Sequence, residues 1–442
     1  MISPTGAPAK NADAQFYLRK IASWILRAEP ILLLLIAPAL LFPSPGLTLF
    51  LIALPMMWLS AWLASGHVVP RTPLDVALAL LLGMILISLF ATFDIGFSLP
   101  KVTGVLLGVG AYYAIVRKIT SSAQLRLAIL ALILAGAGLA LIGLVGINWL
   151  QKWPVLSAIV QRLPRLLRGL PGAEEGFSPN AVAGSLVLVI PIPLFWLAAS
   201  RHSSAQDPTG ADSTALGPAA RIALVVGLAI SLATLLLTQS RGAWTGLLLA
   251  MAVVLSWRSA RWRVVALITI AGLSLLMLVV GPSRLLAFIL PDAGAGLANS
   301  VAGRQEIWSR ALLVIQDFPL SGIGMNAFRR IVPALYPTFV NPQDFDVASA
   351  HNHLLQAALD LGLPGLGAYV ALWLGAAAML IQVRRRSPAP EPRAFVDGLA
   401  AGLLAHFIFS LTDAIPLGAK VGLFFWLVLG IVASLYRLAP RV

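Results

Sequence analysis

Long apolar runs alternate with short polar segments along most of this 442-residue chain. A helix that crosses a bilayer needs about 20 mostly apolar residues. We place the spans near residues 30–43, 47–64, 74–92, 100–116, 125–148, 180–199, 220–238, 243–257, 264–281, 365–383, 395–412 and 420–437. The pattern therefore predicts an all-α polytopic membrane protein of about twelve spans. Residues 1–442 would form a single transmembrane domain.

Composition supports a membrane protein and narrows its chemistry. The chain is 59% hydrophobic and 11% charged, whereas soluble proteins average about 25% charged residues. Its net charge of +14 would suggest nucleic acid in a soluble protein. In a membrane protein, a positive net charge is explained first by topology and second by an anionic lipid substrate. We therefore expect membrane lipids and no nucleic acid as partners. The chain has no cysteine, which excludes thiol catalysis and thiolate metal sites.

Basic residues are concentrated in every second connection between the spans. The connections at 44–46, 93–99 and 413–419 contain no Lys or Arg. The opposite connections carry Arg71, Arg117, Lys118, Arg126, Arg201, Arg221, Arg258, Arg261, Arg263, Arg384, Arg385, Arg386 and Arg393. The positive-inside rule therefore predicts that both termini are cytoplasmic.

Residues 149–179 form the first of two outer segments that are too long to be simple connections. Arg162, Arg165 and Arg168 recur every third residue beside several leucines. This spacing predicts a basic amphipathic helix lying in the membrane interface.

Residues 282–364 form the second and larger outer segment. Ser300 can cap a helix that runs to about Phe318. Gly322–Gly324 then break the chain before a second helix around Asn326–Leu335. The apolar face of the first helix is expected to comprise Ile307, Ala311, Leu312 and Ile315. A long outer segment built from helices predicts an active-site lid or a binding surface.

A polar stretch at 350–356 ends this outer segment where the chain returns to the membrane. It contains His351 and His353, two of only five histidines, together with the amides Asn352 and Gln356. Polar groups at a membrane-embedded position are costly and therefore predict function.

Two arginines are expected on the same side of the membrane as His351. Arg241 lies in a tight turn between two spans, and Arg304 lies one turn into the first outer helix. Two guanidinium groups suit a diphosphate, because each can donate two hydrogen bonds to phosphate oxygens. A histidine suits removal of a proton from a hydroxyl. Together they predict group transfer from a lipid diphosphate to an alcohol, without paired carboxylates.

Four motifs resemble the O-antigen ligase and O-antigen polymerase superfamily. They are Thr-Gln-Ser-Arg-Gly-Ala at 238–243, Gly-Arg-x3-Trp at 303–308, Pro-Leu-x-Gly-x-Gly at 319–324, and His-Asn-x9-Gly-x2-Gly at 351–365. The Pro179-Asn180 entry into a span is also similar. By motif the resemblance covers roughly residues 175–370, and by topology the whole chain.

The resemblance implies a type C-like, inverting and metal-independent glycosyltransferase of the bacterial inner membrane, with no cofactor. Its ligases transfer a polysaccharide from undecaprenyl diphosphate to a hydroxyl of lipid A–core on the periplasmic face. His351 would be the general base, and Arg241 and Arg304 would bind the diphosphate. Arg165 and Arg168 are further candidate ligands of the diphosphate, although arginines in an interfacial helix are more often anchors to lipid headgroups. Supporting residues would be Asn352, Gln356, His353, Asn180 and Ser240.

Several other functions fit the same residues. An O-antigen polymerase or a protein O-oligosaccharyltransferase would use the same donor and the same base. A lipid-linked sugar flippase or an anion carrier would explain the spans and the positive outer face. Transporters, however, usually place ionisable groups at the bilayer midplane, whereas here the polar groups gather at one face.

Each candidate residue also has a structural interpretation. His351 could be a helix-capping or interfacial histidine with a satisfied hydrogen bond, and this interpretation is preferred for His353. Arg241 could anchor a helix end at the interface. Arg304 could pair with Glu306 or Asp317. Asp344 and Asp346 resemble the acid-x-acid pair of metal-dependent glycosyltransferases, but without a third ligand we interpret them as a solvated loop.

Overall fold

The computed structural model describes residues 8–41, 52–149, 153–167, 176–206, 217–258, 301–340, 347–387 and 389–440, together with a few positions between 261 and 272. Within these ranges every long element is a helix. Seven of the described helices are long and apolar enough to cross a membrane: Ile95–Lys118, Ser122–Gly146, Pro179–Ser200, Pro218–Leu237, His353–Arg386, Pro390–Ser410 and Lys420–Leu438. The prediction of an all-helical polytopic membrane protein is confirmed. Most of the expected span at 264–281 lies outside the described residues.

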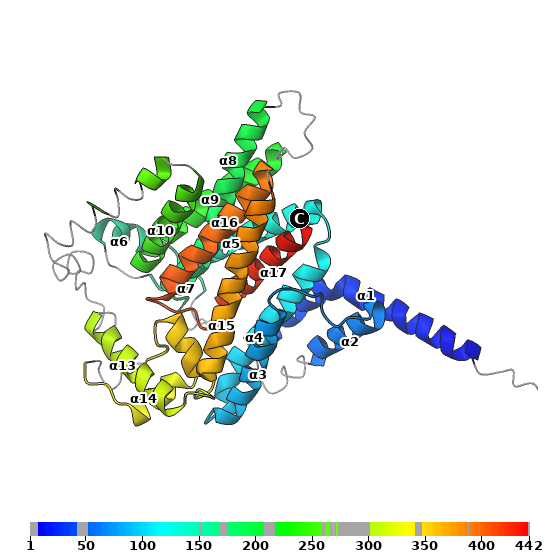
Figure 1. Cartoon of the computed structure of the whole chain (residues 1–442). Coiled ribbons are helices and arrows are strands. Elements are labelled where there is room, and N and C mark those ends of the chain that lie inside the picture. The colour runs from blue at the N-terminus through cyan, green and yellow to red at the C-terminus, as the bar shows by residue number, and fades with distance from the viewer. Residues whose placement is uncertain are drawn as a thin grey trace, which may run out of the picture.

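The N-terminal half of the bundle contains α1 (Pro8–Leu41), α2 (Ala53–Ser65), α3 (Asp75–Ala91), α4 (Ile95–Lys118), α5 (Ser122–Gly146), α9 (Pro218–Leu237) and α10 (Arg241–Arg258). The C-terminal half contains α15 (His353–Arg386), α16 (Pro390–Ser410), a single 3₁₀ turn η3 (Lys420–Gly422) and α17 (Leu423–Leu438). Helix α16 packs against α10 and against α8 (Pro191–Gln206), while α17 packs against α4 and α15 against α3 (Figure 1). Segments far apart in the sequence therefore build the bundle together.

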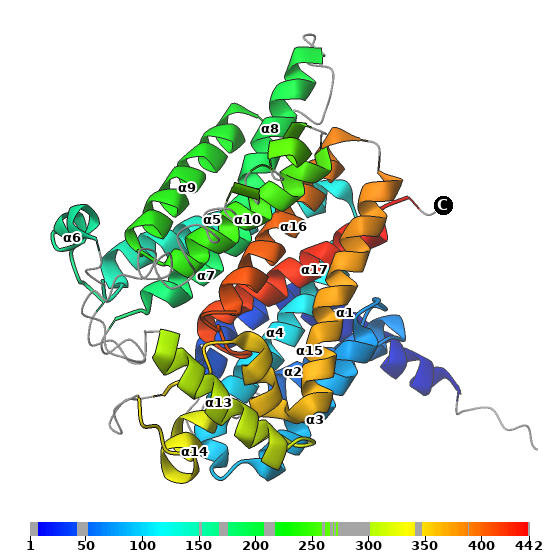
Figure 2. The same cartoon turned by 60° about the vertical axis from the view of Figure 1, so that its left-hand side comes forward.

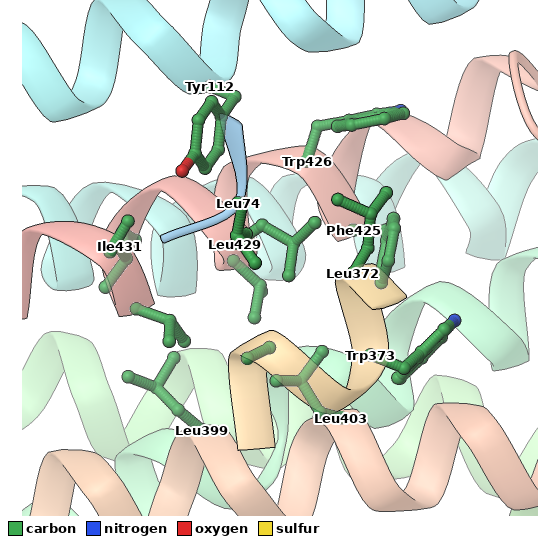
Figure 3. Close-up of a cluster of buried hydrophobic side chains, with 14 of the residues drawn as sticks. Leu74, Tyr112, Leu372, Trp373, Leu399, Leu403, Phe425, Trp426, Leu429 and Ile431 are labelled. Atoms are coloured by element: carbon green, nitrogen blue, oxygen red, sulfur yellow. The ribbon is translucent and has the colours of Figure 1, made fainter. Parts of the chain in front are cut away.

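The largest apolar core lies between α4, α15, α16 and α17. Figure 3 shows Tyr112 of α4, Trp373 of α15 and Leu403 of α16 meeting Phe425 and Trp426 of α17. Trp426 and Tyr112 are fully buried. Because these side chains come from four helices, they fix how the ends of α15 and α16 lie relative to each other.

One expected span is interrupted at a proline but remains a single candidate span, Pro179–Ser200. The run at 180–199 forms α7 (Pro179–Val189) and α8 (Pro191–Gln206). Pro191 has no N–H to donate to the preceding turn, so the helix is interrupted there.

The expected interfacial helix ends before its arginines. Helix α6 covers only Pro154–Val160; Arg162 follows in a turn and Arg165 in irregular backbone. Pro164 explains the difference, because proline lacks an N–H and disfavours helical geometry in the residue before it. Arg168 lies outside the described residues.

The large outer segment contains the two expected helices, α13 (Val301–Asp317) and α14 (Phe328–Leu335). They lie beside the His353 end of α15 (Figure 2). The buried face of α13 differs from the expected one. It comprises Ile307, Ala311 and Val314, whereas Leu312 is 51% exposed. The buried positions follow an i, i+4, i+7 stripe, which turns Leu312 away from the contact.

Two glycines hold this outer segment against α15. Gly362 has φ of +70° and kinks α15, and Gly322 has φ of +64°. The Ile323 N–H donates to the Leu359 carbonyl at 2.8 Å, and the Leu363 N–H donates to the Pro319 carbonyl at 2.7 Å. A Cβ at Gly322 would lie 2.5 Å from the Leu359 carbonyl oxygen, so the two backbones approach as closely as glycine permits.

The opposite end of the bundle carries ion pairs between helices. Arg117 pairs with Glu29 at 2.8 Å, and Arg126 pairs with Glu391 at 2.6 Å. The buried Asp397 carboxylate is held by Arg258 and Arg384. Arg384 ends α15, so this end lies away from His351 by the length of that helix.

Candidate functional site

His351 occupies a tight turn that precedes α15. Its φ is +47°, a left-handed conformation that few non-glycine residues adopt. Asn352 caps the helix, since its side-chain oxygen accepts the Leu354 N–H at 2.9 Å and the Leu355 N–H at 3.1 Å. The Asn352 amide also donates to the Leu411 carbonyl at 3.1 Å. This residue thereby joins the start of α15 to the end of α16.

His351 forms a pair with Asp413. The His351 Nδ1 lies 3.1 Å from the Asp413 Oδ1, and the side chains are 21% and 16% exposed. A carboxylate can only accept from a neutral imidazole, so this contact assigns the proton to Nδ1. The Nε2 lone pair is then available to take a proton from a hydroxyl.

Arg241 begins α10 after a strained turn. Gln239 has φ of +53°, and its buried side chain accepts the Trp153 N–H at 2.9 Å. A Cβ at Gly242 would lie 3.0 Å from the Thr412 hydroxyl, so the start of α10 touches the turn that carries Asp413. Burial lowers the pKa of Arg241, and the nearby charge of Arg304 lowers it further. The charge of Arg304 therefore acts on Arg241.

Arg304 is brought to His351 by helix α13. Trp308, one turn further along, donates its indole N–H to the Ala350 carbonyl at 2.9 Å. The half-buried Arg304 has an Nε atom with no hydrogen-bond partner among the described residues. Its two suggested carboxylate partners have other contacts. Glu306 accepts the Val340 N–H at 3.0 Å, and Asp317 accepts from the Tyr336 hydroxyl.

His353 points into the core and not toward His351. It is 3% exposed, its Nδ1 lies 2.9 Å from the Tyr369 hydroxyl, and Trp373 and Phe407 contact its ring edge-on. Its Nε2 is buried and has no hydrogen-bond partner among the described residues.

The side-chain amide of Gln356 stabilises the His351 turn through hydrogen bonds. Its Oε1 accepts the Ala350 N–H at 2.9 Å, and its Nε2 donates to Asp360 at 2.8 Å. Both Gln356 and Asp360 are almost fully buried.

The other residues expected at the site are Ser240, Asn180 and Arg165, and they differ in burial. Ser240 is buried in the Arg241 turn, and Asn180 is half-buried in the first turn of α7. Arg165 is exposed, although the hydrogen bond from Trp153 to Gln239 ties the start of its segment to the Arg241 turn.

Asp413 was not predicted as part of the site. The expected topology could have pointed to Asp413, because it places the 413–419 connection on the same side of the membrane as His351. In the part of the chain that the structure describes, no three His, Cys, Asp or Glu side chains are grouped to hold a metal ion. Asp344 and Asp346 lie outside that part.

The arrangement combines a histidine oriented by a carboxylate with two neighbouring guanidinium groups. The His351–Asp413 pair can remove a proton from an attacking hydroxyl. The guanidinium groups can stabilise charge on a departing diphosphate.

Comparison with known protein families covers these same residues. Residues 226–370 match the model of the O-antigen ligase family. No curated protein matches the chain. The matched region contains Arg241, Arg304 and His351, and it ends just after the Gly362 kink. Residues 226–370 therefore carry the domain of the O-antigen ligase superfamily, which confirms the resemblance seen in the sequence.

Proposed function

We propose that this protein is an O-antigen ligase with a type C-like fold of about twelve spans. It would transfer a polysaccharide from undecaprenyl diphosphate to a hydroxyl of lipid A–core at the periplasmic face of the bacterial inner membrane. The observation that carries the proposal is the His351–Asp413 pair. The turn that carries Asp413 contacts the start of α10, which carries Arg241, and the His351 turn is bonded to α13, which carries Arg304. The match to the O-antigen ligase family supports it.

In the proposed reaction, Arg241 and Arg304 bind the donor diphosphate. The acceptor oxygen attacks the anomeric carbon while Nε2 of His351 takes the hydroxyl proton. The bond between that carbon and the diphosphate breaks, and undecaprenyl diphosphate leaves with the bonding electrons. Attack opposite the leaving group inverts the anomeric centre. Asp413 holds the imidazole in the reactive tautomer and stabilises its positive charge after proton transfer.

Purified full-length protein in lipid nanodiscs tests the proposal. The reaction contains undecaprenyl-diphosphate-linked polysaccharide, lipid A–core and excess chelator. We expect polysaccharide-capped lipid A–core. Activity that is lost in chelator and restored by magnesium or manganese would contradict the metal-independent mechanism.

The same assay separates the ligase from its relatives. Elongation of the donor glycan without capped lipid A–core would identify a polymerase. Transfer to a protein hydroxyl would identify a protein O-oligosaccharyltransferase. Either result would replace the ligase proposal while leaving His351 as the expected base.

A further inference from the structure

Asp360 of α15 is a buried carboxylate that the proposed reaction does not use. It is 1% exposed, and two groups donate to its Oδ1 atom. The Gln356 Nε2 lies at 2.8 Å, and the Asn326 backbone N–H lies at 3.3 Å. Burial of a carboxylate costs free energy unless hydrogen bonds compensate for the lost water. Its donors therefore show which parts of the chain Asp360 joins.

The Gln356 side chain has a defined orientation between Asp360 and the His351 turn. An ionised carboxylate can only accept, so the Gln356 atom that faces Asp360 is the amide nitrogen. The amide oxygen then faces the Ala350 backbone N–H at 2.9 Å, and a backbone N–H can only donate. Both ends of the side chain therefore require the same orientation of the amide.

Ala350, the residue before His351, is held through both of its backbone polar groups. Its N–H donates to Gln356, and its carbonyl oxygen accepts the Trp308 indole N–H at 2.9 Å. His351 itself has φ of +47°, a conformation that persists only where neighbouring contacts enforce it. The two hydrogen bonds at Ala350 therefore help to fix the backbone from which the imidazole reaches Asp413.

The other end of this chain of hydrogen bonds is anchored outside α15. Asn326 precedes α14 and has φ of +69°. Its backbone N–H donates to Asp360, and its side-chain amide donates to the Phe97 carbonyl of α4 at 3.1 Å. Asp360 is therefore tied to α4 and to the segment before α14, and it offers Gln356 an acceptor at a fixed place.

We propose that Asp360 is a positioning residue for the His351 base. It orients Gln356, Gln356 holds the Ala350 N–H, and the turn that follows directs the imidazole toward the acceptor hydroxyl. The inference rests on the proposed function, because it takes His351 as the base. Proton transfer requires hydrogen-bond distance between the base and the hydroxyl, so a small displacement of the imidazole slows turnover. Loss of the hydrogen bonds should therefore lower kcat and leave substrate binding unchanged.

Three substitutions test this chain of contacts. Gln356→Met keeps the side-chain length, removes both hydrogen bonds and leaves Asp360 unaltered. Asp360→Leu removes the acceptor, whereas Asp360→Asn keeps an oxygen that can accept from Gln356 without the charge. The matched control is Gln382→Met, the same substitution on the same helix, where Gln382 accepts from Arg386 at 3.0 Å and from the Tyr436 hydroxyl at 3.3 Å. Thermal stability, kcat per folded molecule and both KM values are measured on the full-length protein in nanodiscs.

For Gln356→Met and Asp360→Leu we expect kcat to fall about 10–100-fold with unchanged KM for donor and acceptor. Asp360→Asn should retain most of the turnover, and Gln382→Met all of it. The double variant Gln356→Met with Asp360→Leu should be no slower than the slower single variant, since residues that act as a unit are not additive. Introduced into His351→Asn, Gln356→Met should cause no further loss.

Unchanged kcat per folded molecule in Gln356→Met, even with lower thermal stability, would show that these contacts are only structural and would overturn the inference. A loss in Asp360→Asn as large as in Asp360→Leu would also overturn it, because the charge and not the hydrogen bond would then matter. An equal loss in Gln382→Met would have the same consequence. Absence of any transfer by the unaltered protein, or full activity of His351→Asn, would instead contradict the proposed function itself.

Discussion

Three described non-glycine residues adopt positive φ, and all lie at the end of the bundle that carries His351. They are Gln239, Asn326 and His351. Such conformations cost free energy and persist only where surrounding contacts enforce them. Gln239 precedes Arg241, Asn326 contacts Asp360, and His351 is the expected base. No sequence pattern reveals a left-handed histidine, so this feature needed the structure.

The role of His351 is tested with the substitution His351→Asn, because asparagine adopts a left-handed backbone more readily than alanine does. We expect His351→Asn to lower turnover by about 10²–10⁴ while donor binding persists, since only proton transfer is lost. The comparison variant is His353→Phe, which keeps an aromatic ring but loses the Tyr369 contact. It should lower thermal stability and retain most activity per folded molecule. An active His351→Asn beside a folded but inactive His353→Phe would reverse the assignment.

Asp413 is expected to act through His351 as a positioning residue. Asp413→Asn should lower kcat with little change in either KM, because the amide can misorient the imidazole and cannot neutralise its charge. Introduced into His351→Asn, the same change should have almost no further effect, since residues acting as a unit are not additive. Kinetics of the two single variants and the double variant check this. Full additivity of the losses would show that Asp413 acts independently of His351.

Arg241 and Arg304 should not be replaceable by lysine. Arg241→Lys and Arg304→Lys retain the charge but lose the planar fork that donates two hydrogen bonds to a diphosphate. We expect weaker donor binding and lower kcat/KM in both, measured by donor titration and initial rates. Near-normal values in both variants would show that the arginines contribute only positive charge and no specific hydrogen bonds to the diphosphate.

At the scale of elements, the Gly322–Gly362 contact determines whether the outer helices stay attached to α15. Gly362→Ala should destabilise the protein by at least about 1–2 kcal/mol, from the left-handed backbone alone. The added Cβ would also lie 2.4 Å from the Leu320 carbonyl oxygen. Because α13 carries Arg304, activity should fall as well.

The matched control for this change is Gly367→Ala. Gly367 lies on the same helix, and a Cβ there would meet nothing within 4 Å. We expect unchanged or slightly higher thermal stability, since alanine favours helix. Equal destabilisation by both substitutions would contradict a specific role for the Gly362 contact.

Helix positions were largely predictable from the sequence, and helix contacts were not. Apolar runs predicted α3, α5 and α9 closely, because length and hydrophobicity decide a membrane helix. Topology also predicted that Arg241, Arg304 and His351 would share one side. Asp413 lies 62 residues from His351 in the sequence. Only the packing of α16 against α10 and α15 brings it there, and no local pattern records that packing.

At the scale of the whole molecule, the cysteine-free chain permits a direct test of orientation. Ser309 is exposed on α13, and Thr120 is exposed beyond the end of α4 at Lys118. We expect a membrane-impermeant maleimide applied to intact cells to label Ser309→Cys and to label Thr120→Cys only after lysis. Labelling of both positions before lysis, or of Thr120→Cys alone, would contradict the proposed topology.

The ion pairs at the Arg384 end of the bundle also bear on how the chain enters the membrane. Arg126 and Glu391 are 265 residues apart. At a ribosomal rate of about 5–20 residues per second, Glu391 is made roughly 13 to 53 seconds after Arg126. The translocon therefore meets Arg126 as an uncompensated cation, and the pair forms only when α16 arrives. With the expected topology, the same arginine would direct insertion early in synthesis and join α5 to α16 late, so replacing it should disturb two events separated in time.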